Sequence, residues 1–301
     1  MPRGVPKAGF RLTQNRINNG ITKPMPNSRP MFMQPIHQPM IPAVVAAPVV
    51  EETEQEIRAK LSERFEALTD VTHAAIDGTV RAFVISGPAG LGKSSEVTRV
   101  LEERNPFYTM ISGFVRPTGL YKTLYEYRHK GSVVVFDDAD SIFNDEISLN
   151  MLKKACDTTK KRTLSWLAES KMEDEGGEKL PRTFEFEGTV IFITNYDFDD
   201  FISRGSRLSP HFEALVSRSM YLDLKMKTRK DYLTRIKMKL EDGMLRSRGL
   251  SQRDEDDVVR FIEKNSDSLR ELSLRIVIKI ADLKKAMPGN WETRARVMCC
   301  K

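Results

Sequence analysis

The chain of 301 residues has few cysteines and no long apolar run. Its three cysteines are Cys156 and the adjacent pair Cys299 and Cys300, a spacing that matches neither a zinc site nor a disulfide framework. We therefore expect a protein of a reducing compartment. The longest apolar stretch, 41–50, is short and broken by two prolines, and no apolar leader precedes it. The sequence predicts a cytoplasmic protein with no membrane partner.

Acidic residues are absent from the first 50 positions. The whole chain has 48 Lys and Arg against 42 Asp and Glu, and the basic excess lies entirely in this segment. More than half of the fifteen prolines also lie there, without helical or strand periodicity, so we predict a disordered basic arm over 1–50. Residues 2–7 are similar to an AT-hook core, but Val5 stands where a second arginine is expected. The arm therefore either contacts DNA or serves as a solubilising tail.

A phosphate-binding loop follows a predicted buried strand over 80–86. Its spacing is G-x-x-x-x-G-K-[ST], in which the glycines let backbone N–H groups point at phosphate oxygens. An amphipathic helix follows and directs its positive end at the same anion. In this pattern the Lys93 ammonium reaches the β- and γ-phosphates and the Ser94 hydroxyl coordinates Mg²⁺. We expect the whole loop to bind the nucleotide through Gly87, Pro88, Ala89, Gly90, Leu91, Gly92, Lys93, Ser94 and Ser95.

Acidic residues end a second strongly apolar stretch, 131–140. Ligands of parallel α/β sheets bind at the carboxyl ends of the strands, so these side chains are expected to face the phosphate loop. Asp137 fits the position associated with Mg²⁺, and Asp138 fits the position that orients and deprotonates the attacking water. A later apolar strand ends in Asn195 at the same edge, where a carboxamide can hold that water against the γ-phosphate.

The character of the chain changes after its fifth predicted strand, because only helical periods follow. We predict an α/β nucleotide-binding domain over 51–226, a small helical lid domain over 227–287 and a C-terminal tail over 288–301. Between 163 and 187, two alternating segments flank an acidic, glycine-bearing tip. This pattern predicts a hairpin-like excursion from the main domain.

The order of these motifs resembles that of the AAA+ ATPases over roughly residues 55–285. The segments 119–125, 136–140 and 152–155 are most similar to AAA+ ATPases encoded by bacteriophages. The resemblance implies an α/β fold in which a P-loop NTPase parallel sheet of AAA+ type precedes a helical lid. It also implies ATP and Mg²⁺ as ligands, and a homo-oligomeric ring or partial ring with ATP between subunits. A phage protein of this kind would act in the host cytoplasm.

The resemblance further assigns roles to single residues. Asn195 matches the sensor-1 polar residue, and Arg218, in a Ser-Arg pair before the last strand, matches the arginine finger that acts on a neighbour's nucleotide. Arg275 matches the sensor-2 arginine of the lid, with Arg270 as the competing choice. Most of the family have Glu where Asp138 stands. The shorter side chain would place the base farther from the water. Replication initiators of the family have the same Asp-Asp pair, which implies slow, switch-like hydrolysis.

We therefore expect a Mg²⁺-dependent ATPase whose catalytic residues are Lys93, Asp138, Asn195 and Arg218. The basic arm favours work on DNA in phage replication, recombination or packaging, because it attracts phosphates of any sequence. Three alternatives stay open. The neutral charge of the rest of the chain is compatible with a protein-remodelling AAA+ chaperone. The phosphate loop by itself is also compatible with a small-molecule kinase. Asp138 in place of the usual Glu is compatible with a nucleotide-gated scaffold with weak turnover.

Overall fold

The structure of the protein is a computed structural model that describes residues 52–167, 172–173 and 177–301. The predicted arm over 1–50, with its proposed contact to DNA, lies outside these residues, as does part of the predicted hairpin tip. The described residues belong to one compact unit. In them, no helix is both long and apolar enough to cross a membrane.

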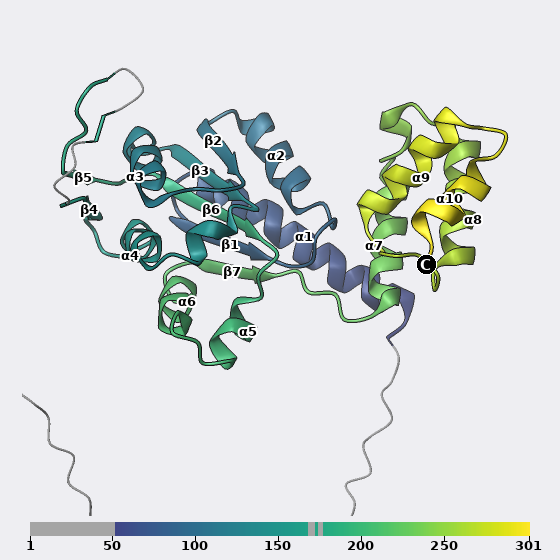
Figure 1. Ribbon diagram of the computed structural model, residues 1–301, viewed down its shortest axis with the longest axis horizontal. Helices are drawn as coiled ribbons and strands as arrows, with labels where there is room; N and C mark the ends of the chain where they lie inside the picture. The colour runs from purple at the N-terminus through teal and green to yellow at the C-terminus, as the bar shows by residue number, and fades with distance from the viewer. Residues whose placement is uncertain (1–51, 168–171, 174–176) are drawn as a thin grey trace, which may run out of the picture. The chain divides into compact units, whose positions relative to one another are not determined.

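A five-stranded sheet lies at the centre of the N-terminal part of this unit (Figure 1). In sheet order its strands are β2 (Phe107–Ser112), β3 (Ser132–Asp137), β6 (Thr189–Thr194), β1 (Ala82–Ser86) and β7 (Met220–Asp223). All neighbouring strands pair in parallel. The central strands are apolar along their length because helices cover both faces of the sheet.

Helices from different parts of the sequence cover the two faces (Figure 1). One face packs against α1 (Glu54–Ile76) and α2 (Lys93–Arg104). The other face packs against α3 (Pro117–Glu126), η1 (Asp140–Phe143), α4 (Glu146–Ala155), α5 (Phe198–Ser203) and α6 (Ser209–Val216). Alternation along β1 divides its side chains between these layers, since Phe83 and Val84 belong to opposite clusters.

The predicted hairpin-like excursion is confirmed at its base. Strands β4 (Thr163–Ser165) and β5 (Thr183–Glu185) pair antiparallel. Tyr121 on α3 anchors the pair, because its hydroxyl donates to the Pro181 carbonyl at 2.9 Å and its ring meets that of Phe184 edge-on at 5.1 Å between centroids.

Beyond β7 the described chain is helical and forms its own apolar cluster. This helical bundle consists of α7 (Arg229–Glu241), η2 (Arg246–Arg248), α8 (Gln252–Asn265), α9 (Leu274–Ala286) and α10 (Trp291–Cys299). A parallel sheet of the P-loop type followed by helices is the fold class that the sequence predicts, and that class is confirmed. The proposed boundary between 226 and 227 stays a prediction.

The expectation of a tail over 288–301 is wrong, because α10 packs into the helical bundle. Its buried stripe consists of Trp291, Ala295 and Cys299, spaced one helical turn apart. Two of these three side chains are small, so the stripe lacks the Leu and Ile residues that mark the other helices. The same segment buries the adjacent Cys300.

Candidate functional site

The phosphate loop joins β1 to α2 and contacts the helical bundle closely. Gly90 and Gly92 have φ values of 76° and 90°, a left-handed conformation that side chains other than glycine rarely adopt. A Cβ atom on Gly90 would also lie 2.7 Å from the Cβ of Ser273, just before α9. The Leu274 N–H donates to the Gly90 carbonyl at 2.8 Å. Glycine is therefore required at the apex of the loop by both backbone conformation and space.

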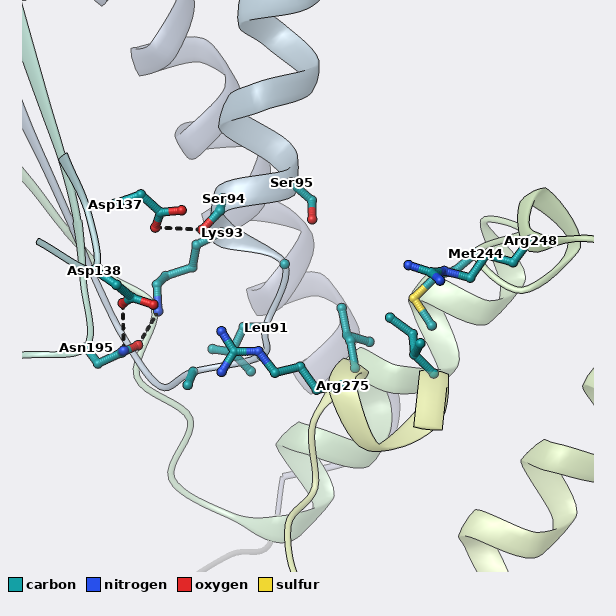
Figure 2. Close-up of a pocket in the computed structure, with 15 residues that line it drawn as sticks. Leu91, Lys93, Ser94, Ser95, Asp137, Asp138, Asn195, Met244, Arg248 and Arg275 are labelled. Carbon is teal, nitrogen blue, oxygen red and sulfur yellow. Dashed lines mark hydrogen bonds between the residues drawn. The ribbon is translucent and has the colours of Figure 1, made fainter. Parts of the chain in front are cut away.

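A cavity of about 240 Å³ opens at the N-terminal end of α2 (Figure 2). Three parts of the chain supply its walls: the loop, the carboxyl ends of β3 and β6, and the helical bundle. The lining residues are Ala89, Gly90, Leu91, Gly92, Lys93, Ser94, Ser95, Asp137, Asp138, Asn195, Met244, Arg248, Leu274, Arg275 and Ile278. The structure thus brings most of the predicted site residues together in one pocket.

Lys93 is almost fully buried, at 5% exposure, with its ammonium inside the loop. Its Nζ donates to the carbonyls of Gly87 at 2.5 Å and Pro88 at 2.9 Å, and to Oδ1 of Asn195 at 3.0 Å. Gly87 and Pro88 therefore contribute carbonyl oxygens rather than pocket surface. Burial lowers the pKa of Lys93 to about 8, against the opposing effect of the nearby carboxylates, of which Asp138 has the largest influence.

Ser94 and Asp137 meet at the predicted metal position. The Ser94 hydroxyl donates to Oδ1 of Asp137 at 2.8 Å (Figure 2). Burial raises the pKa of Asp137, and the hydrogen bond from Ser94 partly offsets that rise. A hydroxyl and a carboxylate side by side are the hard oxygen donors that Mg²⁺ takes alongside water and substrate phosphates. The donor set therefore fits Mg²⁺ bound together with a nucleotide.

Asp138 follows β3 in a left-handed backbone conformation, with φ of 52°. Its N–H donates to the Ile193 carbonyl at 3.0 Å, which ties the turn to β6. Its Oδ1 accepts a hydrogen bond of 2.8 Å from Nδ2 of Asn195. Aspartate is among the few residues other than glycine that adopt this conformation readily. This turn directs the carboxylate toward Asn195 and Lys93.

A hydrogen-bonded pair that the sequence did not reveal supports this edge of the sheet. The Thr194 hydroxyl donates to Oδ1 of Asp140 at 2.6 Å and accepts from the Tyr196 N–H at 3.0 Å. Burial raises the pKa of Asp140. These bonds fix the two residues on either side of Asn195. The only sequence signal is a further acid after the Asp137-Asp138 pair, which also matches a solvated turn.

The predicted arginines lie in different places. Arg275 extends from the start of α9 toward the loop and lines the pocket (Figure 2). Among the described residues that line it, neither Arg270 nor Arg218 occurs. The Arg270 N–H donates to the Cys299 carbonyl at 2.9 Å, and Nη1 of Arg218 donates to the Ala214 carbonyl at 2.8 Å. Of the two candidates for the sensor-2 role, Arg275 is therefore the one that lines the pocket.

Four further lining residues come from the helical bundle and were missed: Met244, Arg248, Leu274 and Ile278. Ile278 is an apolar residue that lies outside the buried stripe of α9. An apolar side chain at such a position is a signal by which the sequence could have indicated a pocket residue. Arg248 lies in a connection between helices, where periodicity carries no information. These residues form the part of the lining that the helical bundle contributes together with Arg275.

No family model matches the sequence. The chain is 36% identical over 248 residues to an uncharacterized 36.7 kDa protein of Enterobacteria phage T4, from the nrdC-mobD intergenic region. This similarity covers 81% of the chain and 75% of the phage protein.

Two solved structures from Thermotoga maritima are similar at low sequence identity. One is the RuvB Holliday junction branch migration motor, with a TM-score of 0.42 and 15% identity over 81% of this chain and 69% of that one. The other is domain III of the replication initiation protein DnaA, with a TM-score of 0.45 and 12% identity over 80% of this chain and 92% of that one.

Proposed function

The chain belongs to the same family as the 36.7 kDa protein of phage T4, and for this phage-related protein we propose Mg²⁺-dependent hydrolysis of the β–γ phosphoanhydride of ATP. One observation carries the proposal. The loop residues Lys93 and Ser94 meet the carboxylates of Asp137 and Asp138 in a single pocket at the carboxyl edge of the sheet. A phosphate cradle, a metal position and a candidate base are therefore within reach of one substrate.

The residues divide the reaction among them. The backbone N–H groups of the loop and the Lys93 ammonium bind the β- and γ-phosphate oxygens. Ser94 and Asp137 would hold Mg²⁺, whose charge would neutralise those oxygens. Asp138 accepts a proton from the water that attacks in line, and Asn195 orients that water. Products are ADP and inorganic phosphate.

Two arginines complete the proposed site. Arg275 reaches the phosphates from the helical bundle, which its place in the pocket wall supports. Arg218 acts on the nucleotide of a neighbouring subunit in a homo-oligomer, a role that agrees with its position outside the pocket of its own chain. The assembly we propose is a ring or partial ring of AAA+ type.

We propose DNA as the polymer on which this ATPase works, in phage replication, recombination or packaging within the host cytoplasm. The basic excess of the chain lies in residues 1–50, which have no acidic residue to oppose attraction to phosphates. Counterion release makes such binding independent of base sequence and sensitive to salt.

Steady-state ATP turnover, measured with double- and single-stranded DNA across a salt series, tests the proposal. Lys93→Ala and a chain lacking residues 1–50 are the companion variants. We expect turnover that requires Lys93 and is stimulated by DNA at low salt only when the arm is present. Turnover stimulated by polypeptides instead would indicate a protein remodeller. Phosphate transfer to a metabolite would indicate a kinase, and ATP binding without turnover would indicate a scaffold.

A further inference from the structure

An arginine of the helical bundle lies against the phosphate loop. Arg235, on α7, is only 4% exposed, and its guanidinium carbon lies 3.3 Å from the centroid of the Phe65 ring on α1. Its Nε donates a long hydrogen bond of 3.4 Å to the Leu91 carbonyl. Its Nη2 is buried and has no hydrogen-bond partner among the described residues. Burial lowers the pKa of Arg235 to about 10.

Comparison with a second buried arginine shows that Arg235 is unusual. Arg162, also 4% exposed, donates from Nη1 to the Ala155 carbonyl at 2.7 Å and from Nη2 to the Gly188 carbonyl at 2.9 Å. Both ends of that guanidinium are satisfied, as a structural role requires. A buried charge without such partners normally destabilises a fold, so packing alone does not account for Arg235.

The contacts of Arg235 continue a series between the helical bundle and the loop. Leu274 binds the carbonyl of Gly90, and Arg235 binds the carbonyl of Leu91. A Cβ atom on Gly92 would lie 3.8 Å from Nη2 of Arg235. Three consecutive loop residues therefore touch the bundle immediately before α2, whose first N–H groups face the phosphate position.

The charged residues around Arg235 bear on whether the neighbouring cavity or the phosphate loop is the place where its charge acts. A cavity of about 590 Å³ adjoins it between α1, α2 and α7. The carboxylates that line this cavity are Glu66, Asp70, Glu96, Glu241 and Asp242. The cations that line it are Arg58, Arg235 and Lys239, so carboxylates outnumber cations and the lining disfavours a phosphate. Glu96 and Asp242 attract the charge of the guanidinium, but among the described residues no carboxylate forms a hydrogen bond or ion pair with Arg235.

We propose that Arg235 is a positioning residue of the nucleotide site. It holds the Leu91–Gly92 segment in its phosphate-binding conformation and adds positive potential behind the β- and γ-phosphates. Binding of a polyphosphate is thereby coupled to the docking of the helical bundle. This inference rests on the proposed function, because it concerns the same pocket.

The test compares Arg235→Met with Arg235→Lys and wild type by calorimetric titration at pH 7 with Mg²⁺-ATP, Mg²⁺-ADP and Mg²⁺-tripolyphosphate. We expect Arg235→Met to weaken ATP and tripolyphosphate binding roughly tenfold, because one partly screened charge near the phosphates is lost. Arg235→Lys should recover part of that loss. The unfolding temperature of the ligand-free Met variant should equal or exceed that of wild type, since an unpaired buried charge has been removed.

Arg58→Met is the matched control. Arg58 joins the same elements at the surface, through Glu54 on α1 and Glu241 on α7, without touching the loop. We expect its polyphosphate affinity to equal that of wild type. The inference would be overturned if Arg58→Met weakened polyphosphate binding as much as Arg235→Met does. It would also be overturned if Arg235→Met left that affinity unchanged, or if the unfolding temperature of Arg235→Met fell by a large amount. Wild-type protein that binds no polyphosphate would instead refute the proposed function, and the inference with it.

Discussion

Asn195 donates a hydrogen bond of 2.8 Å to Asp138, the carboxylate proposed as the general base (Figure 2). The same carboxamide accepts a hydrogen bond of 3.0 Å from the Lys93 ammonium. One side chain thus links the proposed phosphate ligand to the proposed base. In the proposed reaction, a γ-phosphate that binds Lys93 would remove this donor from the Asn195 oxygen, which could then accept a hydrogen bond from the attacking water.

Replacing Asn195 tests this link. We expect Asn195→Ala to lower kcat by roughly a hundredfold, since one orienting hydrogen bond in the transition state is lost. ATP affinity should change less, because Lys93 keeps two carbonyl acceptors in the loop. Steady-state kinetics and ATP titration measure the two effects. Asn144→Ala is a control on a nearby exposed carboxamide outside the pocket lining, and an equal loss there would contradict the assignment.

Asp138→Asn separates binding from hydrolysis. Asparagine tolerates the left-handed backbone at this position, so the turn should keep its shape. We expect ATP to bind with at least wild-type affinity, because a negative charge near the phosphates is removed, while turnover falls below about 1% of wild type for want of a base. Titration and single-turnover kinetics provide the measurements. Wild-type turnover in this variant would exclude Asp138 as the base.

The lowered pKa of Lys93, about 8 in the free protein, predicts a pH dependence of ATP binding. A bound polyphosphate favours the ammonium form of Lys93. Binding therefore takes up a proton at every pH at which Lys93 of the free protein is neutral. The dissociation constant should be constant below about pH 8 and rise about tenfold per pH unit above it, until the pKa of the complex is reached. Titrations from pH 7 to 9.5 measure this profile. A flat profile in wild type would contradict it, and Lys93→Ala should be flat.

The convergence of the site was predictable because it depends on strands that the sequence marks clearly. The phosphate loop, the Asp137-Asp138 pair and Asn195 each follow an apolar run, and parallel strands end at one edge of a sheet. The register agrees, since Ser86 at the end of β1 lies beside Thr194 at the end of β6, with Asp137 beside Ile193. The catalytic roles of these residues stay predictions until they are measured.

The contribution of the helical bundle was not predictable in the same way. Which residues of η2, α9 and the connection after α7 reach the pocket depends on how the bundle docks. Helical periodicity says only which face of each helix is buried. Arg235 illustrates the difficulty. An arginine in a charged helix is expected to be exposed, yet its side chain is buried against Phe65.

The packing of helix α10 leads to a prediction about the stability of the protein. Trp291 is 6% exposed, with its ring centroid 5.3 Å from that of Phe261 and the Lys284 ammonium 4.8 Å above it. We expect Trp291→Ala to lower the free energy of unfolding by about 3–5 kcal/mol through the cavity it leaves. Glu292→Ala, at the next and exposed position, should change it by less than about 0.5 kcal/mol. Denaturant titration distinguishes the two, and equal small effects would contradict the packing of α10.

Arg218 provides a test of assembly. If it acts on a neighbour's nucleotide, Arg218→Ala should bind ATP normally but turn it over at least about a hundredfold more slowly. Mixing it with inactive Lys93→Ala should restore part of the activity, because an intact loop from one subunit then meets an intact Arg218 from the other. Arg204→Ala, at an exposed arginine paired with Asp200, is the control and should retain full turnover. A mixture as inactive as its components would show that Arg218 does not complete the site across a subunit boundary.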